Sequence, residues 1–116
     1  MKLAQIKAEL QAEAVQMNDP HILEQDFKHV FASDLMSDAL AMIHEGEHVL
    51  FLTGLANVQT LRTAEMLDIP VIIYVRNKQP DAKMMEMADE LGISIFNTHL
   101  TMFEACGILY GMGLRP

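Results

Sequence analysis

Four short apolar segments recur along the chain at a constant spacing. They begin at Phe27, Val49, Val71 and Ile93, so that each starts 22 residues after the one before, and they read FKHVFA, VLFL, VIIYV and ISIF. Short apolar or alternating runs of this length are typical of strands. The residues between them suffice for a helix and its two connections. The spacing therefore predicts a strand, helix, strand unit that occurs three times.

The segments after these strands carry helical patterns. They cover residues 34–43, 57–68, 81–92 and 101–113. In the third of them Met84, Met87, Ala88 and Leu91 fall at i, i+3, i+4 and i+7, which places them on one face of a helix. We interpret this methionine stripe first as part of the core.

Capping signals lie where the predicted helices should begin and end. Asn57 suits the position before a helix, and Thr101 with Glu104 spells a capping box. Pro80 suits a first helical turn, and Gly92 suits the end of a helix.

The composition of the strands indicates how the sheet is built. VLFL and VIIYV are continuously apolar, as strands buried on both faces of a parallel sheet are, whereas FKHVFA alternates and should lie nearer an edge. A further strand is expected in AEAVQM, between the first helical segment MKLAQIKAEL and the polar turn NDPH. With right-handed crossovers, we predict a single α/β domain over residues 1–116. It has three layers, with helices on both faces of a mostly parallel sheet of four to five strands.

The composition of the chain excludes several classes of partner. A formal net charge of -8 disfavours nucleic acid, because binding to phosphate backbones requires clustered Lys and Arg. No segment has the roughly 20 apolar residues that a membrane span requires, and the first residues lack a signal-peptide pattern. The single cysteine, Cys106, cannot close an intrachain disulfide. We expect a cytoplasmic protein with neither a nucleic-acid nor a membrane partner.

The stretch HEGEH matches two zinc-protease patterns, His44-Glu45-x-x-His48 and His44-x-x-Glu47-His48. A zinc site of this kind requires both histidines on one face of a continuous helix. Gly46 interrupts such a helix, and a strand follows at once. We interpret the stretch as a solvated turn and expect no bound metal. A metal-dependent enzyme that uses His44 and His48 remains one alternative, and a transferase at the strand ends is another.

Other catalytic patterns are absent from the sequence. It contains no P-loop, no G-x-G-x-x-G and no G-x-S-x-G. Cys106 shares a helical face with Met102, Ala105 and Leu109, which favours a core residue over a nucleophile. The sequence predicts neither an enzyme nor a cofactor.

Small polar residues gather where the predicted strands end. Ligands bind beyond the carboxyl ends of the strands in open α/β sheets, where helix N-termini present free N–H groups. Several of these residues would also serve simply as helix caps. Arg76 stands apart, because it could pair with an anionic ligand, with Asp34 or with a partner subunit. The candidate ligand-binding residues are Ser33, Asp34, Thr53, Gly54, Asn57, Arg76, Asn97, Thr98 and Thr101.

The sequence from SDLMSDALAM through TMFEACGIL resembles the DRTGG domain family over about residues 1–114. Thr53 and Gly54 stand where the family commonly has Thr and Gly after a strand, and Thr101, Phe103 and Ala105 match the opening of its last helix. The name-giving letters differ, since residues 55–56 are Leu-Ala and residues 76–78 are Arg-Asn-Lys.

The resemblance implies a role in regulation. Similar modules occur in some phosphotransacetylases and in pyrophosphatases with CBS domains, and a similar fold opens HPr kinase/phosphorylase. Small standalone members imply a protein partner in hydrogenase or signalling systems. From the resemblance and the residues together we expect a non-catalytic regulatory, dimerisation or scaffold module that binds a small anionic ligand such as a nucleotide.

A homodimer is also expected from the apolar residues of the last helix. The sequence contains ten methionines, and methionine is common on adaptable binding surfaces as well as in cores. Met85 lies off the core stripe of its helix. We predict that the dimer buries the surface around Phe103, Tyr110 and Met112.

Overall fold

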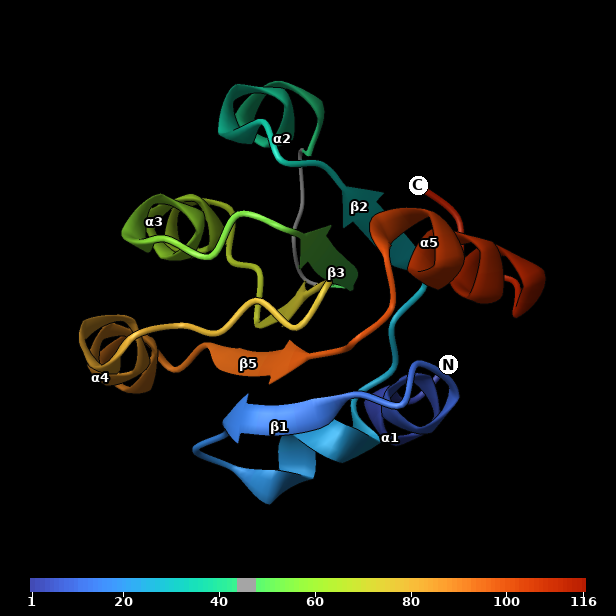
Figure 1. The fold of residues 1–116 in the computed structure, drawn as a ribbon, viewed down its shortest axis with the longest axis horizontal. Coiled ribbons are helices and arrows are strands. Elements are labelled where there is room, and N and C mark those ends of the chain that lie inside the picture. The colour runs from blue at the N-terminus through green and yellow to red at the C-terminus, as the bar shows by residue number, and fades with distance from the viewer. Residues whose placement is uncertain (44–47) are drawn as a thin grey trace.

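A computed structural model describes residues 1–43 and 48–116 and contains one mixed sheet. The five strands in these residues lie in the order β1-β5-β4-β3-β2 (Figure 1). β2 to β5 are parallel to one another, and β1 is antiparallel to β5. The predicted α/β fold is therefore confirmed, and so is the additional strand in AEAVQM. The strands are β1 (Glu13–Gln16), β2 (His29–Ala32), β3 (Val49–Thr53), β4 (Val71–Tyr74) and β5 (Ser94–Asn97).

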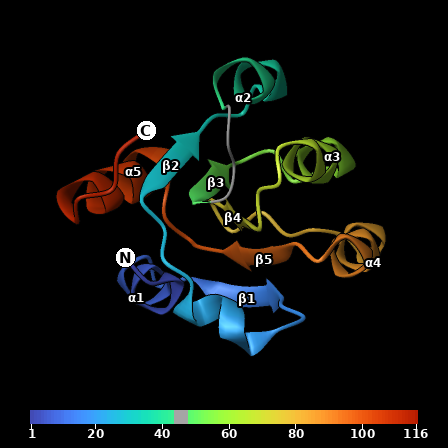
Figure 2. The same cartoon turned by 180° about the vertical axis from the view of Figure 1, so that it is seen from behind.

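Helices cover both faces of the sheet. The three that connect the parallel strands, α2, α3 and α4, lie on one face, and α1 and α5 lie on the other, as Figures 1 and 2 show from opposite sides. Each connection advances by one strand in the same direction, so right-handed crossovers place all three connecting helices on the same face. The helices are α1 (Leu3–Glu9), α2 (Met36–Met42), α3 (Val58–Met66), α4 (Ala82–Leu91) and α5 (Met102–Gly111), with a 3₁₀ turn at Pro20–Glu24.

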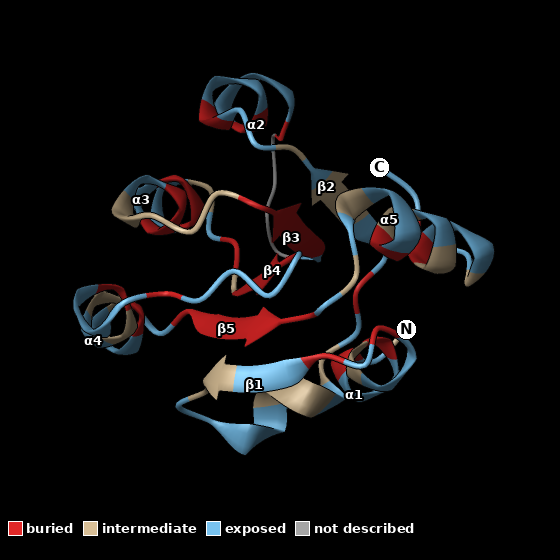
Figure 3. Ribbon diagram, in the orientation of Figure 1, coloured by how far each residue is buried: buried red, intermediate tan, exposed pale blue. Residues whose placement is uncertain are grey.

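The sheet separates two apolar cores. Successive side chains of β3 point to opposite faces, so Leu50 and Leu52 pack in the core with α1 and α5, whereas Val49 and Phe51 pack in the core with α2 to α4. Figure 3 shows β3, β4 and β5 as buried. The uninterrupted apolar runs of the central strands thus reflect burial on both faces, as predicted from the sequence.

The strand predicted nearest an edge, β2, is an edge strand. Two of its four residues are half-buried and two are exposed. The C-terminal residues cover part of its free edge: Val30 N donates to Arg115 O at 3.0 Å, and Arg115 N donates to Lys28 O at 3.3 Å. The remaining part of this edge borders a groove between β2 and α2.

Most of the predicted helix ends agree with the structure. Asn57 Oδ1 accepts from Thr60 N, Thr101 and Glu104 form a complete capping box, and Gly92 ends α4 with φ of 70°. Asp81 is the N-cap of α4, so Pro80 lies just before the helix and not in its first turn. Aspartate accepts the free N–H of Met84, a bond that proline at that point cannot supply.

The histidine motif is only partly described. Its first four residues, 44–47, lie outside the described residues, whereas His48 directly precedes β3, with Nδ1 3.4 Å from Asp26 O. Among residues 1–43 and 48–116, no helix has the length and apolar character needed to cross a membrane.

A buried hydroxyl pair joins β4 to α3. Tyr74 is fully buried, and its hydroxyl lies 2.6 Å from Thr60 Oγ1. Thr60 Oγ1 itself donates to Asn57 O at 2.8 Å, so the Tyr74 hydroxyl is the donor of the pair. Burial raises the pKa of Tyr74 to about 12.

This shift predicts that the protein loses stability in alkali. Above about pH 10 the unfolded chain releases the tyrosine proton, whereas the folded chain keeps it until about pH 12. The free energy of unfolding should therefore fall by about 2–3 kcal/mol across this range. Urea unfolding at several pH values measures it. Tyr74→Phe should remove this part of the pH dependence. If the free energy of unfolding fell with pH equally in Tyr74→Phe and wild type, Tyr74 would not be its cause.

Candidate functional site

Asp34 connects the loops that follow two neighbouring strands. Its Oδ1 accepts from Gly54 N at 2.6 Å and from Thr53 Oγ1 at 3.1 Å, although Asp34 is 19 residues earlier in the chain than Thr53. Thr53 Oγ1 in turn accepts from Leu55 N. Because β2 and β3 are parallel, both loops leave the sheet at the same edge. The carboxylate thus fixes the turn that begins at Gly54.

Arg76 is held in an uncommon backbone conformation. Arg76 and Asn77 follow β4 with φ of 57° and 56°, in the left-handed region that costs a residue with a Cβ roughly 1 kcal/mol or more. Two hydrogen bonds fix the turn, from Arg76 N to Leu100 O at 2.8 Å and from Asn77 N to Thr98 O at 2.9 Å. The loop between β5 and α5 therefore fixes the backbone from which the Arg76 side chain extends.

The Arg76 guanidinium lies directly over Gly54. A Cβ atom placed on Gly54 would be 2.7 Å from Arg76 Nη2 and 3.4 Å from Asp34 Oδ1. Glycine therefore allows the guanidinium and the carboxylate to approach the same backbone position. Within residues 1–43 and 48–116, the Arg76 side chain makes no hydrogen bond or ion pair, and it is exposed. Its donors are free to bind a ligand.

Four of the other candidate residues use their polar side chains within the fold. Thr98 Oγ1 donates to Leu10 O at 2.6 Å and accepts from Leu100 N, and Ser33 Oγ accepts from Leu35 N. Asn97 is buried in β5. Asn57 and Thr101 cap α3 and α5. The structure therefore brings Asp34, Thr53, Gly54 and Arg76 together, whereas Ser33, Asn57, Thr98 and Thr101 bond to backbone groups of the surrounding loops and helix ends.

The pKa values of two side chains in α5 are shifted in directions that suit structural roles. Hydrogen bonds from the backbone and the hydroxyl of Thr101 lower the pKa of Glu104, as expected for a capping carboxylate. Burial raises the pKa of the Cys106 thiol, which disfavours the nucleophilic thiolate. In the part of the chain that the structure describes, no cluster of three His, Cys, Asp or Glu side chains could hold a metal ion.

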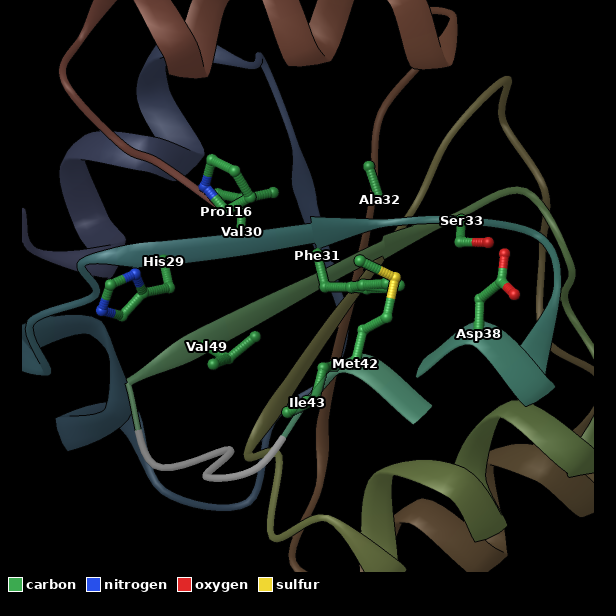
Figure 4. A pocket seen from close by; sticks show the side chains of 10 residues that line it. All are labelled: His29, Val30, Phe31, Ala32, Ser33, Asp38, Met42, Ile43, Val49 and Pro116. Carbon is green, nitrogen blue, oxygen red and sulfur yellow. The ribbon is translucent and has the colours of Figure 1, made fainter. Parts of the chain in front are cut away.

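A groove at the edge of the sheet was not predicted from the sequence. It has a volume of about 600 Å³ and runs between β2 and α2, with Phe31, Met42 and Ile43 along it and Ser33 and Asp38 at one end (Figure 4). Of the nine candidate residues, Ser33 alone lines it. The alternation in FKHVFA indicated an edge strand, but not the space beside it.

Comparison with solved structures shows what this fold is similar to. No family model matches the chain, and neither does any curated protein. The fold is similar to that in a crystal structure of the CBS and DRTGG domains from the regulatory region of Clostridium perfringens pyrophosphatase, complexed with its activator, diadenosine tetraphosphate. The TM-score is 0.72 at 18% sequence identity, and the match covers 93% of this chain and 45% of that one. The likeness confirms the DRTGG-like fold that the sequence resemblance implies.

Proposed function

We propose that this chain is a non-catalytic regulatory module that binds a small anionic ligand at the strand-end site formed by Asp34, Thr53, Gly54 and Arg76. The observation that carries the proposal is the unpaired Arg76 guanidinium above Gly54. A guanidinium presents a planar set of donors that matches the oxygens of a phosphate or carboxylate. Because the turn beneath the guanidinium is already fixed, less conformational entropy is lost when a ligand binds.

The carboxylate beside Arg76 narrows the class of ligand. One oxygen of Asp34 is engaged by the Gly54 amide and the Thr53 hydroxyl, which offsets part of its repulsion of an anion. Its other oxygen is available to accept a hydrogen bond. A ligand that carries both a phosphate and hydroxyl donors satisfies Arg76 and Asp34 together, as a nucleotide with its ribose does. This pairing favours a nucleotide over inorganic phosphate.

The fold comparison supports this choice of ligand class. The similar pyrophosphatase region is regulatory and was crystallised with a nucleotide activator, diadenosine tetraphosphate. The present chain spans 45% of that chain, so the whole-protein activity is not carried over. The guanidinium, carboxylate and amide groups at the site bind and orient ligands, and none of them is a nucleophile activated by a base. The cytoplasmic location and a protein partner in hydrogenase or signalling systems stay predictions from the sequence.

Ligand-dependent thermal unfolding tests the proposal. We expect diadenosine tetraphosphate or a mononucleotide to raise Tm more than inorganic phosphate does, because only the nucleotides engage both Arg76 and Asp34. Arg76→Ala should weaken nucleotide binding on the order of 10- to 100-fold, the usual loss for a charge-assisted contact. Arg62→Ala removes an exposed arginine from α3 and should leave the affinity unchanged. Equal Tm shifts in wild type and Arg76→Ala would contradict the proposal.

A further inference from the structure

The outer face of α5 combines two exposed aromatic side chains with two glycines. Phe103 is 89% exposed and Tyr110 is 61% exposed. They are seven residues apart, two helical turns, and so lie on one face of α5. Gly107 and Gly111 lie on the same face, at i+4 and i+8 from Phe103. Large apolar side chains are seldom left so exposed next to one another in a protein that acts alone.

Within residues 1–43 and 48–116, no packing contact requires the two glycines. A Cβ atom placed on Gly107 or Gly111 would meet no atom of the described residues within 4 Å beyond its chain neighbours and the backbone of α5 itself. Glycine inside a helix costs about 1 kcal/mol relative to alanine. Helices packed against each other approach to about 8–10 Å, and the side chains at the contact set the distance. Glycines on an open face therefore suit the close approach of a helix from another molecule.

We propose that this face of α5 is an interface with a second copy of the chain, in which the two α5 helices pack antiparallel. The face is complementary to itself: it carries a bulky aromatic near each end and a gap at each glycine. In an antiparallel pair, the first turn of one helix lies against the last turn of the other. Phe103 of each copy then packs over Gly111 of its partner, which is the reciprocal contact that a two-fold axis requires.

The charges on this face also favour a second copy in the antiparallel orientation. Glu104 lies in the first turn of α5, and Arg115 lies just beyond its end, with Cζ 3.7 Å from the centre of the Tyr110 ring. Reversing the second helix places Glu104 of each copy beside the Tyr110–Arg115 stack of the other. The chain carries a net charge of -8, so most of its surface repels another copy. On this face, by contrast, Glu104 of each copy attracts Arg115 of the other, which gives two attractive pairs.

Sedimentation velocity tests the interface. We expect the wild-type chain at micromolar concentrations to sediment with twice the mass of one 13.0 kDa chain. Gly107→Arg and Phe103→Glu should each give a monomer, because they place a charged side chain in the contact. Met66→Glu changes a side chain that is 70% exposed on α3 and should stay dimeric.

Gly107→Ala separates loss of the interface from loss of the fold. Its methyl group improves helix propensity, so it should raise the stability of the monomer at high dilution while weakening the dimer. A wild-type chain that stays monomeric throughout the micromolar range would overturn the proposal. This holds even if α5 were found to bind a different protein, because the proposed partner is a second copy of the chain. A dimer that persists in both Gly107→Arg and Phe103→Glu would overturn it as well. These outcomes do not depend on Arg76, so they are distinct from failure of the proposed ligand site.

Discussion

Truncation of Met84 to alanine should lower the free energy of unfolding by about 2–5 kcal/mol. Met84 lies on α4, is 1% exposed, and packs in the core between the sheet and α2 to α4. Removing its side chain leaves a cavity that the rigid neighbouring strands cannot fill. The same substitution at Met66, which is 70% exposed on α3, should change the free energy by no more than about 0.5 kcal/mol.

Urea unfolding of the two variants measures this difference. Both replacements remove the same atoms and introduce a good helix former, so helix propensity and residue type are matched. The comparison separates methionines that form the core from methionines on the surface. If the two variants lost equal stability, the placement of Met84 in the core between the sheet and α2 to α4 would be wrong.

Gly54→Ala should weaken ligand binding, by up to about the 10- to 100-fold loss expected for removal of Arg76. The added Cβ would lie 2.7 Å from Arg76 Nη2, so the guanidinium must leave its position over the turn. This guanidinium is the end of a flexible side chain and moves at little cost. We therefore expect the free energy of unfolding to stay within about 1 kcal/mol of wild type.

Gly107→Ala is the matched control for this substitution. It adds the same methyl group at a position where nothing lies within 4 Å, and it should leave ligand affinity unchanged. Calorimetric titration of wild type, Gly54→Ala and Gly107→Ala with the nucleotide that gives the largest Tm shift measures the effect. Wild-type affinity in Gly54→Ala would show that the ligand does not use the guanidinium above Gly54.

The sequence predicted the sheet and its helices because their signals are local and repeated. The 22-residue spacing, the methionine stripe of α4 and the caps at Asn57 and Thr101 each depend on residues close together in the chain. The antiparallel pairing of β1 with β5 could not be predicted in this way. A strand pattern shows which side chains are buried, but not which strand lies beside it.

The sequence indicated candidate residues at the strand ends but not their arrangement. Asp34 and Gly54 were both candidates, but their 2.6 Å hydrogen bond joins residues 20 positions apart and has no sequence signal. The left-handed turn at Arg76 was likewise unpredictable, because arginine seldom adopts this conformation and distant carbonyl groups of the β5–α5 loop hold it. The groove beside β2 depends on how far α2 lies from the edge strand, which the sequence does not encode locally.

NMR mapping of ligand-induced changes in backbone amide shifts shows directly whether a ligand binds at the strand-end site. We expect diadenosine tetraphosphate, or the nucleotide that binds more tightly, to shift the amides of Gly54, Arg76 and Asn77 most. These changes should disappear in Arg76→Ala. Shifts confined to the groove around Phe31 and Met42, or the same shifts at Gly54 in wild type and Arg76→Ala, would contradict a strand-end site built on Arg76.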